Sequence, residues 1–95
     1  MLSQFPIDLD KVSKDDIDKE ILRLGMIAEL DAISLYEQLA VKTKNKNIKK
    51  VFLDIAKEEK THVGEFQALL LELDKEQVNE LAKGKKEVEE LSNNG

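Results

Sequence analysis

Apolar residues recur every three or four positions along two long stretches of the chain, residues 14–44 and residues 47–73. This spacing places them on one face of an α-helix, so the pattern predicts two amphipathic helices. Only a few residues connect the stretches, which makes the two helices antiparallel neighbours. The positions that define the faces are Leu22, Gly25, Met26, Ala32, Ile33, Leu39 and Ala40 in the first stretch, and Phe52, Ile55, Ala56, Val63, Phe66, Leu69 and Leu70 in the second.

Residues at the ends of these stretches favour helix termini. Ser13, followed by several aspartates, predicts an N-cap for the first helix. The asparagines after that helix favour a left-handed turn. Asp74 predicts the cap of a third, shorter helix over residues 75–81, with Gln77 at the capping-box position. Gly84 is expected to interrupt this third helix, because glycine is a poor helix former.

The two ends of the chain differ in character from the helices. Residues 1–12 indicate an extended lead-in, because Pro6 disfavours helical geometry at Phe5. Residues 84–95 are mostly charged and indicate either a frayed helix or a charged tail. The predicted fold class is all-α: residues 1–95 form one domain with two long antiparallel helices and a short C-terminal helix.

Polar residues interrupt both apolar faces. Glu59 and His62, the one histidine of the chain, lie about 60° apart around the second helix as Glu-x-x-His. Glu29 and Tyr36 lie two turns apart on the face of the first helix. A buried, unpaired carboxylate costs several kcal/mol, and Lys57 and Lys60 are expected to point to other faces. A metal ion would resolve this cost, since glutamate oxygen and histidine nitrogen together suit iron, manganese or zinc.

Plainer explanations exist for the two polar residues of the first helix. Tyr36 alone is explained by a core aromatic ring with a satisfied hydroxyl group. Glu29 alone is explained by a helix that rolls enough for the carboxylate to reach water. These explanations stay open until the ligands are counted across helices.

Composition narrows the function classes. Charged residues make up 37% of the 95 residues and aromatic residues 4%, which favours long helices with solvated outer faces. The net charge of −5 argues against a nucleic-acid partner. Without cysteine there is no disulfide framework and no cysteine-bound metal. No run of about 18 apolar residues occurs, so no membrane span and a soluble cytoplasmic protein are expected.

One chain offers too few ligands to surround a metal. Two identical chains would offer four carboxylates and two imidazoles on four helices, from Glu29, Glu59 and His62 of each copy. This is the ligand set of a di-iron carboxylate bundle, with one glutamate from each of two helices and Glu-x-x-His from each of the other two. The pattern therefore predicts a two-fold dimer that forms a four-helix bundle with a di-iron centre between the subunits.

The ordered residues Glu29 and Tyr36 in AELDAISLYEQLA, followed by Glu59 and His62 in DIAKEEKTHVGEFQALL, resemble the encapsulated ferritins. These proteins are half-length relatives of ferritin and rubrerythrin, and the resemblance covers about residues 14–90. It implies a ferroxidase that oxidises Fe(II) with O₂ at a site formed between two chains. Glu29 and Glu59 would be the metal carboxylates, His62 the imidazole ligand and Tyr36 a catalytic neighbour.

The same resemblance implies an assembly. The homodimers would form a decameric ring inside an encapsulin nanocompartment, where the oxidised iron is stored. The shell protein would be reached by loading or by fusion, since a similar domain precedes the shell protein in some archaea. Manganese, zinc or calcium are possible substitutes for iron at the site.

Two other functions remain open from the residues. A rubrerythrin-like peroxidase would use the same ligands, but it usually needs an electron donor that a chain without cysteine cannot hold. A non-catalytic helical adaptor would dimerise through the same apolar faces and leave the glutamates hydrated.

Overall fold

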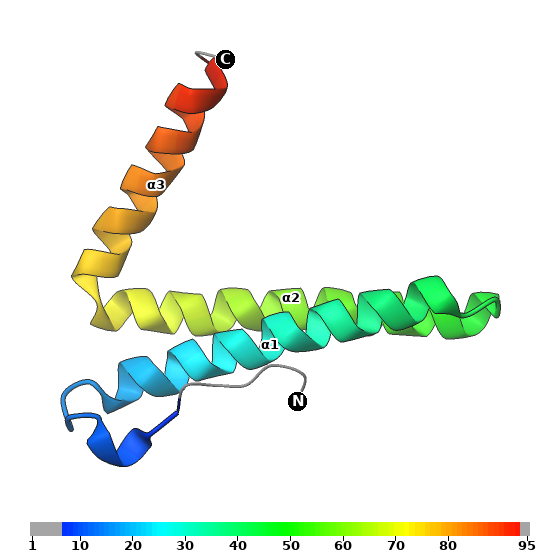
Figure 1. Cartoon of the computed structure of the whole chain (residues 1–95), viewed down its shortest axis with the longest axis horizontal. Helices are drawn as coiled ribbons and strands as arrows, with labels where there is room; N and C mark the ends of the chain where they lie inside the picture. The colour runs from blue at the N-terminus through cyan, green and yellow to red at the C-terminus, as the bar shows by residue number, and fades with distance from the viewer. Residues whose placement is uncertain (1–6, 94–95) are drawn as a thin grey trace.

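The computed structural model of the chain describes residues 7–93 and is all-helical over this range (Figure 1). A single 3₁₀ turn, η1 (Leu9–Lys11), precedes α1 (Ile17–Lys42), α2 (Lys46–Leu73) and α3 (Lys75–Asn93). The described residues contain no strand. The all-α prediction is therefore confirmed.

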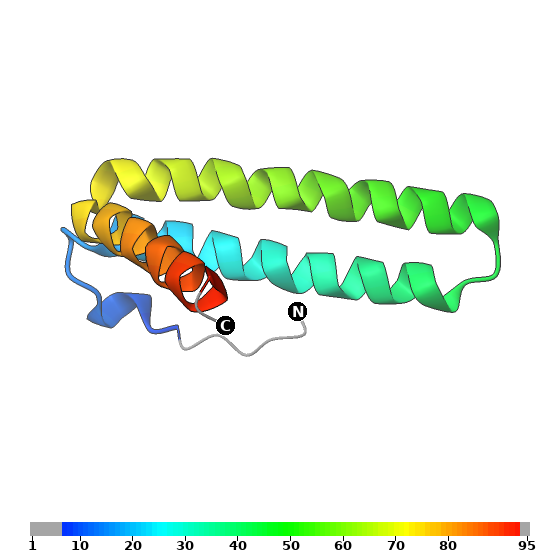
Figure 2. The same cartoon turned by 90° about the horizontal axis from the view of Figure 1, so that it is seen from above.

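The helices α1 and α2 form an antiparallel hairpin, seen side by side in Figures 1 and 2. Asn45 caps the start of α2, since its side-chain oxygen accepts the amide N–H groups of Asn47 (2.9 Å) and Ile48 (3.0 Å). The prediction of a left-handed asparagine turn is wrong, because no non-glycine residue between positions 7 and 93 has a positive φ. Asn45 is extended, with φ −82° and ψ 120°, and acts as an N-cap.

The first helix begins three residues later than its pattern predicts. Asp16 is the residue before α1, and the hydroxyl group of Ser13 donates to its carboxylate at 3.0 Å. Residues 14–16 form a turn, and residues 9–11 form the 3₁₀ turn where an extended lead-in was expected. Phe5 and Pro6 lie outside the described residues.

The third helix is longer than predicted. Asp74 caps it as expected, since its carboxylate accepts the Gln77 amide at 3.0 Å. The predicted interruption at Gly84 is wrong, because α3 continues through this residue to Asn93. A glycine inside a helix costs about 1 kcal/mol relative to alanine, which the surrounding lysine, glutamate and leucine residues, all good helix formers, can offset. Residues 84–93 are therefore helical.

The hairpin has almost no core of its own. Within the described part of the chain the buried hydrophobic residues are Ala40, Ala56 and Leu70. Large apolar side chains remain exposed on all three long helices; among them are Ile21, Leu30, Leu39, Val41, Val51, Leu53, Leu69, Leu73, Val88 and Leu91. So much exposed apolar surface is typical of a chain that completes its core with a partner.

Candidate metal centre

The structure brings Glu29 of α1 together with Glu59 and His62 of α2. The Nδ1 atom of His62 lies 3.3 Å from an oxygen of Glu29 and 3.3 Å from an oxygen of Glu59. One ligand atom from each of the three residues lies within 4.8 Å of the other two. The convergence of the three side chains, expected from the two apolar faces, is therefore present within a single chain.

Helix geometry explains how these residues meet. Glu59 and His62 are one turn apart on α2, so their side chains lie on neighbouring positions of one face. Glu29 reaches them from α1 because the antiparallel hairpin sets the middle of α1 against the middle of α2. A glycine marks the close approach: a Cβ atom at Gly25 would lie 3.2 Å from two ring atoms of Phe66. Gly25 precedes Glu29 by one turn and Phe66 follows His62 by one turn, so the approach of the helices and the distance between the ligands are linked.

Both carboxylates of the group lie close to the imidazole of His62, while a neighbouring lysine pairs with a different carboxylate. Glu29 and Glu59 each lie at ion-pair distance from His62. Lys60, next in sequence to Glu59, instead pairs with Glu37 at 2.9 Å. Lys60 thus reaches across to a carboxylate of α1 outside the group, and the expectation that it points to another face stays a prediction.

The group is partly exposed in one chain. The side chains of Glu29 and Glu59 are each 20% exposed, and that of His62 is 44% exposed. Two carboxylates and one imidazole fit iron, manganese or zinc in donor type. Three donors still leave positions open on any of these ions, so the single chain presents part of a site.

Tyr36 does not belong to this cluster of contacts. Its ring stacks on Phe52 with 5.9 Å between the ring centroids and 30° between the planes. It lies on α1 two turns beyond Glu29. Tyr36 therefore lies on the face of α1 that packs against α2, as its place in the apolar pattern predicted. Its role beside a metal stays a prediction.

Another set of polar contacts could not be anticipated from the sequence. Arg23 of α1 pairs with Glu20 at 2.7 Å and with Asp74, at the junction of α2 and α3, at 3.2 Å. The pair with Glu20 follows a local helical spacing of three residues. The pair with Asp74 joins residues far apart in sequence, and no periodic signal indicates it.

An antiparallel helical pair with a carboxylate on one helix and Glu-x-x-His on the other defines a class, the ferritin-like proteins that bind metal in a helical bundle. The family is more specific. The chain belongs to the rubrerythrin family, whose model matches residues 20–93.

Two relatives place the chain within this class. It is 56% identical to a ferritin-like-encapsulin shell fusion protein of Pyrococcus furiosus over 94 residues, 97% of this chain but 27% of the relative. Its structure is similar to the crystal structure of the encapsulated ferritin domain from Pyrococcus furiosus, with a TM-score of 0.84 and 55% identity. That match covers 98% of this chain and 97% of the domain. The resemblance to encapsulated ferritins is thereby confirmed.

No helix among the described residues is both long enough and apolar enough to span a membrane.

Proposed function

We propose that the chain is a ferroxidase subunit that oxidises Fe(II) to Fe(III) with O₂ at a di-iron site shared by two copies. The observation that carries this proposal is the convergence of Glu29, Glu59 and His62 within 4.8 Å on a hairpin that has almost no core of its own. The same face therefore needs both a partner and a counter-charge. A second copy with two metal ions supplies both.

The charge balance supports two divalent cations. Two copies bring four carboxylates from Glu29 and Glu59, which carry the same total charge as two Fe(II) ions with opposite sign. The neutral total removes most of the cost of enclosing these acids between the subunits. The imidazoles of both His62 residues complete the donor set without changing the charge.

Each residue has a defined task at this site. Nδ1 is the His62 atom that faces both carboxylates, so it is the proposed donor, and Nε2 is left to hold the ring proton. Glu29 and Glu59 would hold the metal ions through their carboxylate oxygens. A bound pair of ferrous ions would supply two electrons to dioxygen, which with two protons gives hydrogen peroxide and two Fe(III). Tyr36, two turns from Glu29, is proposed to hydrogen-bond a ligand or to donate an electron.

The proposed setting is an encapsulin compartment. The relative from Pyrococcus furiosus, a ferritin-like-encapsulin shell fusion protein, supports an association with a shell protein, by fusion or by loading. Two helices enclose no storage cavity, so the Fe(III) product needs a compartment supplied by another protein. Assembly of the homodimers into a decameric ring belongs to the same proposal, by likeness to the encapsulated ferritins.

Anaerobic titration of the metal-free chain with Fe(II), followed by O₂, tests the function. We expect about one iron per chain and a rise in ferric absorbance, both lost in Glu59→Gln. Glu58→Gln is the matched control, because Glu58 is an exposed carboxylate one position away on α2. Equal iron binding and oxidation by Glu59→Gln and the parent chain would refute the proposal. Faster oxidation by peroxide than by O₂ would favour a peroxidase.

A further inference from the structure

The third helix leaves the hairpin at a single non-helical residue. α2 ends at Leu73, α3 begins at Lys75, and Asp74 between them has φ −133° and ψ 91°. A return of this one residue to helical angles would join α2 and α3 into one straight helix. Figure 1 shows α3 projecting away from the hairpin instead.

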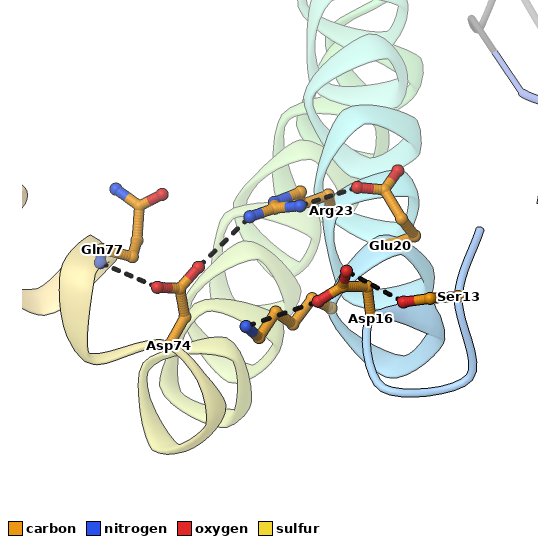
Figure 3. Close-up of polar contacts among 7 residues, drawn as sticks. Ser13, Asp16, Glu20, Arg23, Asp74 and Gln77 are labelled. Carbon is orange, nitrogen blue, oxygen red and sulfur yellow. Dashed lines mark hydrogen bonds and ion pairs between the residues drawn. The ribbon is translucent and has the colours of Figure 1, made fainter.

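Both carboxylate oxygens of Asp74 are engaged, each by a different part of the fold (Figure 3). Oδ1 accepts the backbone N–H of Gln77 in α3 at 3.0 Å. Oδ2 accepts from the guanidinium of Arg23 in α1 at 3.2 Å, and Glu20 accepts a second N–H of Arg23 at 2.7 Å. The Asp74 side chain is 13% exposed and that of Arg23 is 42% exposed, so the pair is shielded from solvent on the carboxylate side only.

The helix that this junction directs carries an apolar stripe that its own hairpin leaves uncovered. Val78, Leu81, Val88 and Leu91 are exposed and recur at helical spacing along α3. Folding α3 back onto α1 and α2 would bury this stripe within the same chain, which the hydrophobic effect favours. A contact at the junction must therefore oppose folding back as well as straightening.

We propose that the Arg23–Asp74 ion pair is a latch that fixes the direction of α3, with Asp74 as its hinge. The latch ties the first helix to the start of the third, so neither alternative arrangement forms without breaking it. It keeps the apolar stripe of α3 outside its own hairpin. The latch involves none of Glu29, Glu59 or His62, and it stands independently of the ferroxidase proposal.

Distances between two spin labels test the latch. The chain has no cysteine, so cysteines introduced at the exposed positions Lys57 on α2 and Glu90 on α3 are the sole labelling sites. Labelled chains are diluted into excess unlabelled chain, so that pulsed electron paramagnetic resonance reports distances within one chain. A straight α2–α3 helix would separate the two backbone positions by about 50 Å. A folded-back α3 would bring them to about 10–20 Å, and the latched arrangement gives a single distance between these limits.

Two variants remove the ion pair in different ways. Arg23→Met leaves the cap of α3 intact, and Asp74→Asn keeps a good capping side chain while it removes the charge. We expect each to raise the ratio of unlatched to latched chains by roughly fivefold. Asp74→Ala removes the ion pair and the cap together, so we expect a larger shift toward the straight helix. Lys60→Met is the control, since it removes the 2.9 Å pair with Glu37 elsewhere on the hairpin, and we expect it to leave the distances unchanged.

The outcomes separate the latch from general loosening. A distance distribution for Arg23→Met that equals the parent distribution, while Asp74→Ala shifts, would show that the cap alone directs α3. An equal shift for Lys60→Met and Arg23→Met would show that any lost ion pair loosens α3. Either result overturns the latch, as would a parent chain without a single dominant distance.

Discussion

The close approach of α1 and α2 at Gly25 gives a prediction that links stability to metal binding. Replacing Gly25 with alanine adds a Cβ atom 3.2 Å from two ring atoms of Phe66 and 3.4 Å from a third. The two 3.2 Å distances are shorter than ordinary van der Waals contacts, so the ring or the helix must move by a few tenths of an ångström. If the helix moves rather than the ring, the same movement is expected to separate Glu29 from His62 one turn away.

Two opposing effects set the size of the change in stability. Alanine in a helix interior is favoured over glycine by about 1 kcal/mol. Overpacking a well-fitted contact costs about 1–3 kcal/mol. The net expectation for Gly25→Ala is a loss of about 0–2 kcal/mol in the free energy of unfolding. Iron affinity should fall by roughly tenfold, the lower end of the effect seen when groups that orient metal ligands are changed.

Urea unfolding followed by circular dichroism, at one fixed chain concentration, measures the first effect, and Fe(II) titration measures the second. Gly84→Ala is the control, because a Cβ atom there meets nothing within 4 Å and only the gain in helix propensity remains. We expect this control to be stabilised by about 0.5–1 kcal/mol. If Gly25→Ala were stabilised as much as Gly84→Ala, with iron affinity unchanged, the reasoning that the helices touch closely at Gly25 would be refuted.

Three further predictions follow from the contacts described above. Chelation of metal should shift the chain toward smaller species in size-exclusion chromatography, because the proposed site is complete only in the assembled form; an unchanged mass would contradict this. Asn45→Ala should lower the free energy of unfolding by about 1 kcal/mol through loss of the α2 cap, and thermal unfolding against an Asn47→Ala control would measure the loss. Tyr36→Phe keeps the ring that stacks on Phe52, so iron stoichiometry should stay the same while the rate of oxidation falls, and an unaltered rate in stopped-flow absorbance would remove Tyr36 from the mechanism.

The sequence predicted the elements well where local signals agree. The bounds of α2 lie within one residue of the prediction, because Asn45 and Asp74 are polar capping residues at its two ends. The end of α3 was wrong because the unfavourable propensity of Gly84 is small beside that of the good helix formers around it. The asparagine turn was wrong because Asn45 satisfies free amide groups more effectively as a cap than as a left-handed residue.

The candidate site was predictable for a different reason. Periodicity assigns a face to each residue, and polar residues on an apolar face stand out without knowledge of the partner helix. Periodicity does not give the register between two helices. The approach of Gly25 to Phe66 and the pair of Arg23 with Asp74 depend on that register, so they required the structure. The proposed dimer, ring and shell depend on surfaces of other chains; the sequence indicates the dimer through its ligand count, and the ring and the shell only through a resemblance.

The scarcity of buried side chains has a consequence for where the proposed oxidation would occur. With Ala40, Ala56 and Leu70 as the buried hydrophobic residues of the described chain, a solitary copy gains little free energy from folding. Its persistence then depends on mass action, and dilute copies are exposed to proteases. If each subunit contributes half of the proposed site, a monomer is also inactive. A high local concentration of copies, as inside the proposed compartment, would favour the folded dimer and its activity together. Reactive oxygen chemistry would then be confined to that compartment.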